Sequence, residues 1–184
     1  MTTMYRTTGA LVLLLCLGGC VSLTPQQCAT ADWHALGRSD SARGLYPQVE
    51  RHTRACARAG LPSNPHLYAQ GYTSGLALYC RPQTILGDAL RGAGNLAICP
   101  VEHRPELLPY YRAGRNVCDA ETALTTLTAE QRRLGAELER GGWTDARHLF
   151  LRQRLYALQG EIESATRARW EAEHLLVRYQ ALRP

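Results

Sequence analysis

Lysine is absent from the 184-residue sequence, so arginine supplies all 21 of its basic side chains. The arginines are interspersed with 16 acidic residues, and the formal net charge is +5. A protein that binds nucleic acid gathers basic residues on one face to meet the phosphate backbone. This distribution argues against such a face, and we expect no nucleic-acid partner.

Closely spaced metal and redox ligands are also missing. The sequence contains no Cys-x-x-Cys pair and no pair of histidines three to five residues apart. Zinc sites and thioredoxin-like redox sites depend on such pairs, because one metal ion or one disulfide must be reached by both side chains. We therefore expect neither a metal nor another cofactor.

No set of acid, base and nucleophile stands out. The segment from Gly71 to Gly75 reads Gly-Tyr-Thr-Ser-Gly, whereas a nucleophile elbow has its serine at the third position. Ser74 also falls within a predicted helix. We expect the protein not to be an enzyme, and a hydrolase is the less favoured alternative.

One apolar run, from near Gly9 to Val21, is shorter than the about 20 residues that a membrane-spanning helix needs. Arg6 precedes the run, and small residues end it, which is typical of a secretory signal. The ending Leu17-Gly18-Gly19-Cys20 resembles the bacterial lipobox. That resemblance implies that the Cys20 thiol receives a diacylglycerol and that the chain is cut before it.

We therefore expect residues 1–19 to be a lipoprotein signal peptide, Cys20 to carry the lipid, and residues 20–27 to form a short tether. Several acyl chains on one residue anchor a protein stably in a membrane. Val21 in place of Asp favours the outer membrane, facing the periplasm, by analogy with sorting in Gram-negative bacteria. A signal cleaved without lipid and an N-terminal core helix remain alternatives.

The remaining chain changes in composition near Cys118. Before it, Gly, Pro, Cys and aromatic residues are frequent, which indicates short helices joined by turns. Asp32 is expected to cap a helix that Gly37 ends, and Asn64 to cap a helix that begins at Pro65. Residues 82–98 show no clear period and are predicted to be a loop, with a loop that contains one helical turn as the alternative.

After Cys118 the apolar residues recur at alternating steps of four and three, a seam that needs a partner helix. The seam is interrupted at Gly141-Gly142, and Thr144 can cap the second helix. The predicted fold is therefore mainly α. A small disulfide-stapled helical domain (28–116) precedes a long antiparallel, coiled-coil-like helical hairpin (117–184).

An ordered set of cysteines, aromatic residues and glycines runs through the first part of the chain: Cys28, Asp32-Trp33, Gly37, Asp40, Gly44, His52-x3-Cys56, Gly60, Tyr68-x2-Gly71-x3-Gly75-Leu76-x2-Tyr79-Cys80, Cys99-Pro100 and Tyr111-x2-Gly114-Arg115. This set resembles the bacterial lipoprotein family called domain of unknown function 2799. The resemblance covers about residues 28–116, although Asp40-Ser41 stands where the family has Asp-Gly. It implies a small exported lipoprotein with no established activity.

An exported protein meets an oxidising compartment, so disulfides are expected. Cys118 lies outside the region of resemblance and is predicted to be the odd thiol. Four cysteines allow three connectivities. The sequence-local choice, Cys28–Cys56 with Cys80–Cys99, is favoured among them.

Six residues are possible binding residues. Trp33, Tyr68, Tyr72 and Tyr79 would line an aromatic groove, although an aromatic residue followed by Gly one turn later also suits close helix packing. Asp40 and His52 are a possible acid–base pair, with a helix cap and a satisfied core histidine as the structural alternative.

Two functions follow from these features. The first is a non-enzymatic envelope protein whose hairpin meets a partner: its own copy, another envelope protein or peptidoglycan. The alternative is a protein that binds a small molecule or a peptidoglycan fragment at its aromatic N-terminal part.

Overall fold

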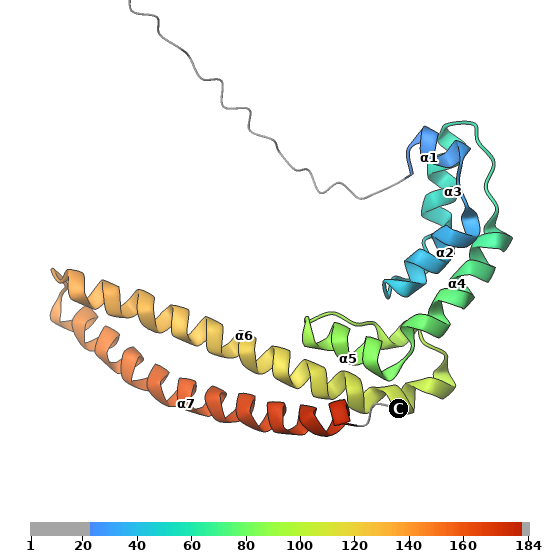
Figure 1. Cartoon of the computed structure of the whole chain (residues 1–184). Helices are drawn as coiled ribbons and strands as arrows, with labels where there is room; N and C mark the ends of the chain where they lie inside the picture. The colour runs from blue at the N-terminus through green and yellow to red at the C-terminus, as the bar shows by residue number, and fades with distance from the viewer. Residues whose placement is uncertain (1–22, 182–184) are drawn as a thin grey trace, which may run out of the picture.

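The computed structural model describes residues 23–181, and all regular elements in this range are helices (Figure 1). No helix in this range is long and apolar enough to cross a membrane. The predicted signal peptide, Cys20 and the start of the predicted tether lie outside the described residues. The elements are α1 (Pro25–Ala29), α2 (Trp33–Ala42), α3 (Val49–Arg58), α4 (Pro65–Tyr79), α5 (Pro82–Leu90), the 3-10 turns η1 (Leu96–Ile98) and η2 (Val101–His103), α6 (Arg104–Arg140) and α7 (Asp145–Ala181).

The first helices begin at side-chain caps. The carboxylate of Asp32 accepts a hydrogen bond from the Ala35 N–H at 2.9 Å, and the Asn64 side chain accepts one from the Leu67 N–H at 3.0 Å. Each cap satisfies a donor that the first helical turn leaves unpaired. Both predicted caps are thus confirmed.

Helices α2 and α4 cross in backbone contact. A methyl group on Gly37 would overlap the Tyr68 carbonyl oxygen, and one on Gly71 would overlap the carbonyl oxygen of His34. A methyl group on Gly75 would overlap the Ser41 hydroxyl oxygen and the Arg38 carbonyl oxygen. These contacts support the packing interpretation of the repeated aromatic–glycine spacing. They also show that Gly37 lies inside α2, so the prediction that it ends this helix is wrong.

Residues 82–90 form helix α5, which corrects the predicted loop. Pro82 occupies the first turn, and Ile85, Leu86 and Ala89 are buried along one face. That face packs on α6, where Gly114 lets the Ala89 side chain approach the helix backbone. Gly87 is not part of this buried face, so its lack of a side chain does not weaken the contact with α6. The three closely spaced glycines obscured the helical period.

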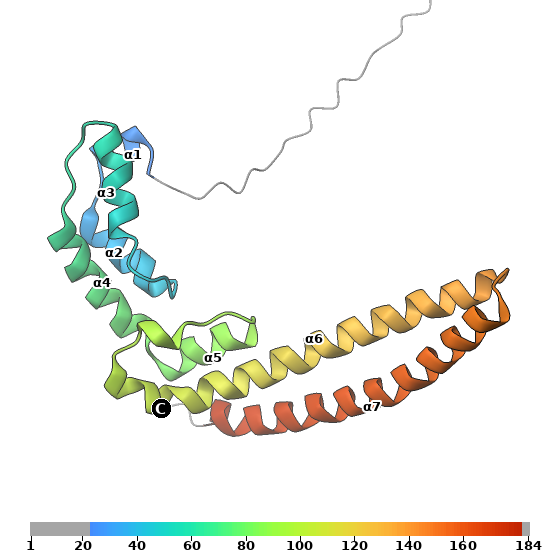
Figure 2. The same ribbon diagram turned by 180° about the vertical axis from the view of Figure 1, so that it is seen from behind.

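Helices α6 and α7 form the predicted antiparallel hairpin, as both views show (Figures 1 and 2). Leu134, Leu151 and Leu158 are its buried centre. Positive φ angles at Gly141 (66°) and Gly142 (78°) make the turn possible. Because α6 starts at Arg104, the predicted boundary at residues 116 and 117 falls inside a continuous helix.

Ion pairs between the two helices fix the register of the hairpin. The Arg147 guanidinium lies 2.5 Å from a Glu137 carboxylate oxygen, and that of Arg154 lies 3.0 Å from a Glu130 oxygen. Arg154 also pairs with Glu161 on its own helix. These residues are only partly exposed, so the pairs add directional contacts at the edges of the leucine seam.

The α2–α4 contact generates a stability prediction. Replacing Gly37 with Ala forces the two backbones apart, and we expect the free energy of unfolding to fall by about 1–3 kcal/mol or more. Chemical denaturation of the full chain measures this change. Gly135→Ala is the matched control, because a methyl group there meets no atom within 4 Å. The control should stabilise its helix by about 0.5–1 kcal/mol. Equal effects of the two substitutions would contradict the close crossing.

Candidate functional site

A buried carboxylate lies where three helices meet. Asp40 on α2 is 2% exposed, and its Oδ2 accepts hydrogen bonds from His52 Nε2 on α3 at 2.9 Å and from the Tyr68 hydroxyl on α4 at 2.8 Å. Its Oδ1 accepts a hydrogen bond from the Arg43 guanidinium at 2.6 Å. The predicted Asp40–His52 pair is therefore formed, and Tyr68 joins it.

The environment of this cluster favours a structural role. His52 is 7% exposed and Tyr68 is 1% exposed, so a substrate cannot reach them in this conformation. The Tyr68 hydroxyl also accepts the Gln48 N–H at 2.8 Å, which ties the start of α3 to α4. Only Arg43 extends from the carboxylate towards solvent. A buried carboxylate with three donors holds its neighbours in fixed positions.

One nitrogen of this cluster has no partner within residues 23–181. His52 Nδ1 is buried without a hydrogen bond, while Nε2 donates to Asp40. No described nucleophile lies within hydrogen-bond distance of this second ring nitrogen. The arrangement therefore lacks the third member that acid–base activation of a nucleophile requires.

Burial raises the pKa of Tyr68 above its ordinary value of 10, and the neighbouring Asp40 carboxylate adds to the effect. Burial also raises the pKa values of Tyr72 and Tyr79. The three phenols keep their protons in the fold, and each makes a buried or partly buried hydrogen bond. They act as polar anchors within the core.

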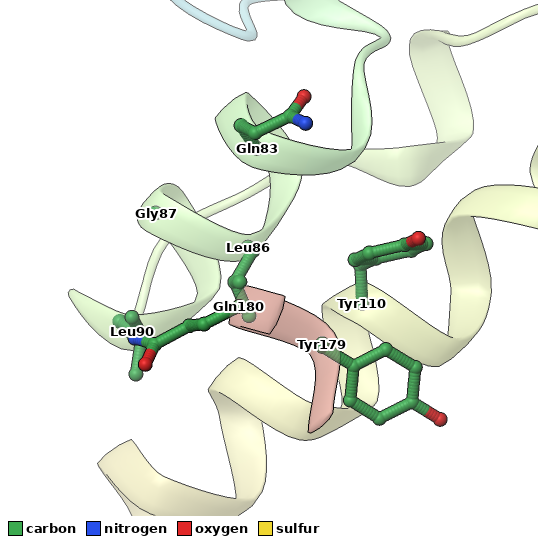
Figure 3. A pocket seen from close by; sticks show the side chains of 7 residues that line it. All are labelled: Gln83, Leu86, Gly87, Leu90, Tyr110, Tyr179 and Gln180. Atoms are coloured by element: carbon green, nitrogen blue, oxygen red, sulfur yellow. The ribbon is translucent and has the colours of Figure 1, made fainter. Parts of the chain in front are cut away.

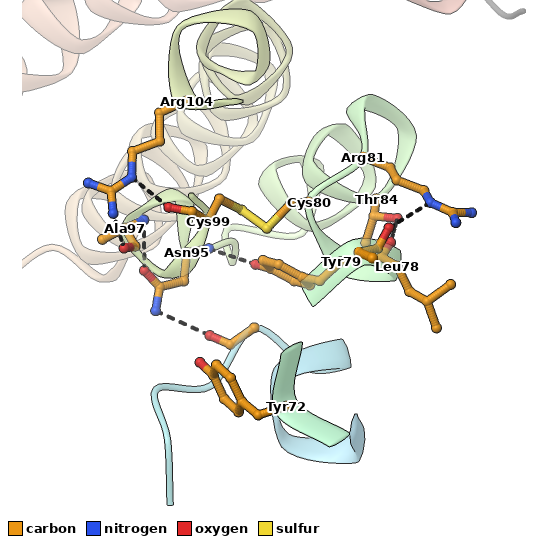
Figure 4. Close-up of a disulfide and its surroundings, with 12 residues drawn as sticks. Tyr72, Leu78, Tyr79, Cys80, Arg81, Thr84, Asn95, Ala97, Cys99 and Arg104 are labelled. Carbon is orange, nitrogen blue, oxygen red and sulfur yellow. Dashed lines mark hydrogen bonds between the residues drawn. A yellow bond between two sulfur atoms is a disulfide. The ribbon is translucent and has the colours of Figure 1, made fainter. Parts of the chain in front are cut away.

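Tyr79 lies beside the second disulfide (Figure 4). Its hydroxyl accepts the Asn95 N–H at 2.7 Å, and the Asn95 side chain donates to the Gly44 carbonyl at 3.2 Å. Arg104 donates to the carbonyl oxygen of Cys99 at 2.8 Å. This network joins the turn after α2 to the segment that leads into α6.

The six predicted binding residues are therefore placed in the core and not along one open groove. Trp33, Tyr68 and Tyr72 pack in one cluster with the Cys28–Cys56 disulfide, and Tyr79 belongs to a second cluster. Each of the six is at most 9% exposed. A ligand-binding role for them stays a prediction, and it requires the helices to separate.

The disulfides follow the sequence-local pairing. Cys28 is joined to Cys56 and Cys80 to Cys99, as favoured from the sequence. Cys118 is the free cysteine among the described residues. It is partly buried near Gly92. No group of three His, Cys, Asp or Glu side chains in residues 23–181 is arranged to hold a metal ion.

A small cavity that the sequence did not indicate lies where the end of α7 returns to α5 and α6 (Figure 3). Its volume is about 170 Å³. Tyr110 and Tyr179 contact each other edge to face in its wall, with ring centres 5.2 Å apart. Its walls carry amide, apolar and phenol groups, and the lining residues are Gln83, Leu86, Gly87, Leu90, Tyr110, Tyr179 and Gln180.

These features define a class of protein: an all-helical, disulfide-bonded domain continued by a helical hairpin. Comparison with protein families identifies the domain. The family described as "Protein of unknown function (DUF2799)" matches residues 32–116, and this part of the chain belongs to that family. No curated protein and no solved structure matches the chain.

The raised pKa of Tyr68 generates a pH prediction. Unfolded Tyr68 loses its proton near pH 10, whereas the folded residue keeps it. The stabilisation is therefore complete below about pH 10 and is lost as the pH rises further. Urea unfolding at about pH 7 and about pH 11 measures the loss.

Tyr68→Phe tests the cause. It should remove the Tyr68 part of this alkaline loss and lower stability at neutral pH by about 1–3 kcal/mol, because Asp40 and the Gln48 N–H lose a partner. Tyr46→Phe is the control, because Tyr46 is largely exposed. An unchanged alkaline loss in Tyr68→Phe would contradict the assignment.

Proposed function

We propose that the protein is an exported, lipid-anchored component of the cell envelope that acts as a structural or interaction module and catalyses no reaction. The observation that carries the proposal is the ending Leu17-Gly18-Gly19-Cys20 after a short apolar run. Lipid on Cys20 would hold the folded domain at a membrane surface, with the outer membrane facing the periplasm as the proposed location.

The disulfides support export. Both cystines are largely buried, and both bridges tie segments that otherwise share few contacts. Disulfides of this structural kind persist in the periplasm and are rare in the cytosol, where thiols are kept reduced. The fold is therefore suited to the compartment to which the proposed signal would deliver it.

The hairpin supports an interaction role. Its helices contain 37 residues each, which corresponds to a length of about 55 Å at 1.5 Å per residue. Most of this length projects beyond the disulfide-bonded domain (Figure 1). Large apolar side chains stay exposed near its tip, among them Trp143, Leu149 and Phe150. Together they would offer a partner an apolar contact surface at the end of the hairpin.

Binding of a small molecule or a peptidoglycan fragment is the second candidate, with a hydrolytic step less favoured. The cavity beside Tyr110 and Tyr179 is the observation that favours it. A volume of about 170 Å³ is below the range of about 300–1,000 Å³ that is usual for ligand sites. The site is therefore sized for part of a ligand, such as one ring or an acyl end.

Replacing Cys20 tests the proposed anchor. In the native chain we expect mass spectrometry to find acylated Cys20 as the first residue and the protein in the membrane fraction. Cys20→Ser should abolish acylation, because only a thiol accepts the diacylglycerol. The variant should therefore no longer be found as an acylated protein in the membrane fraction.

Cys118→Ser is the matched control, since it removes the free thiol and leaves Cys20 intact. It should keep both lipid and location. Residues 1–19 still attached to the native protein, or an unmodified Cys20, would contradict the proposal.

A further inference from the structure

The side of α7 that faces away from α6 carries an exposed apolar stripe. It consists of Leu149, Tyr156, Trp170 and Val177, spaced at multiples of seven residues. Tyr156 is 82% exposed and Trp170 is 59% exposed. The buried residues Leu151 and Leu158 follow Leu149 and Tyr156 by two positions each, which places them about 200° around the helix from the stripe. Helix α7 therefore has two seven-residue seams, and α6 covers only one of them.

A hollow lies on the same stripe at Gly160. A methyl group there would meet no other atom within 4 Å, so no contact within the described chain requires a glycine. Glycine in the middle of a helix lowers helix stability relative to alanine. The hollow has a volume of about 320 Å³ and is bordered by Tyr156 and Glu163. Its size suits one large aromatic side chain.

We propose that a second copy of the chain packs antiparallel along this stripe, with Trp170 of each copy in the hollow at Gly160 of the other. This pairing deepens the proposed interaction role by naming the partner. It is a two-fold arrangement, because the same residues contribute from both sides. In the same register Glu163 of each copy lies opposite Arg167 of the other, so the interface contains two such pairs.

The charges on the stripe agree with this register. Glu163 and Arg167 are exposed and form no ion pair within residues 23–181. Opposite charges at facing positions select an orientation in paired helices. A helix that lies in a membrane surface instead presents an uninterrupted apolar face. The acid, the base and the glycine within the stripe therefore favour a second copy as the occupant.

Sedimentation equilibrium of the full chain, purified from membranes in a density-matched detergent, tests the proposal. We expect the protein mass to rise with concentration from that of one chain to that of two. Trp170→Ala should weaken the dimer at least about tenfold, because a central aromatic side chain contributes strongly to an interface. Val101→Ala is the control, since Val101 is exposed but lies outside α7.

A substitution that fills the hollow distinguishes a loss of self-association from a loss of folding stability. Gly160→Leu should block Trp170 of the second copy and weaken the dimer at least about tenfold, while the midpoint of thermal unfolding stays level or rises. Gly135→Leu, at the other open helix position, should leave the dimer unchanged. A Gly160→Leu variant that dimerises as well as the native chain would overturn the proposal.

Charge reversal tests the register. Glu163→Arg should weaken the dimer, because two arginines then face each other at each pair. Adding Arg167→Glu should restore it, since each reversed residue meets its reversed partner. Failure of the double variant to recover would overturn the antiparallel register.

Two further outcomes would overturn the proposal. One is a single-chain mass at all concentrations. The other is a Trp170→Ala variant that loses binding to phosphatidylglycerol vesicles without a change in mass, which would assign the stripe to a lipid surface. Neither outcome bears on lipid at Cys20, so this proposal can fail while the proposed anchor stands.

Discussion

Two disulfides hold together segments that helix packing alone attaches weakly. The hydrophobic core is divided into three small clusters along an elongated molecule (Figure 2). Helix α1 shares few contacts with its neighbours apart from the Cys28–Cys56 bridge to α3. The Cys80–Cys99 bridge joins the end of α4 to the segment before α6. Each bridge is worth about 2–4 kcal/mol, a large part of the about 5–15 kcal/mol that stabilises a domain. Loss of both bridges would therefore remove a large part of the stability of the fold.

The glycine contacts between α2 and α4 explain why Asp40 and its polar partners are buried. Because α2 and α4 meet backbone to backbone, the Asp40 carboxylate comes within hydrogen-bond distance of a tyrosine 28 residues away in sequence. Removing the carboxylate would leave buried donors unpaired, so the cluster helps to hold these helices in one arrangement. An Asp–His pair suggests catalysis when only the sequence is considered, but here its burial and its partners indicate a role in positioning helices.

Local patterns in the sequence are sufficient to predict the helix starts, the hairpin and the cysteine pairing. Asp32 and Asn64 revealed helix starts, because capping depends on residues only three positions apart. The repeat of four and three revealed the hairpin, since its two helices are neighbours in sequence. The cysteines with local partners were paired correctly. The errors at Gly37 and in α5 arose because Gly37 serves contact with a distant helix and because Gly87 lies off the face of α5 that packs on α6. The cavity at Tyr179 depends on how the end of α7 docks on α5, and the seam between α6 and α7 does not specify that contact.

Peptide mapping, without reduction, of the chain purified from cells tests most directly the two disulfides on which the fold depends. The structure predicts linked peptides for Cys28 with Cys56 and for Cys80 with Cys99, and an unlinked Cys118. Reduced thiols at all five positions, or crossed pairs such as Cys28 with Cys80, would contradict it.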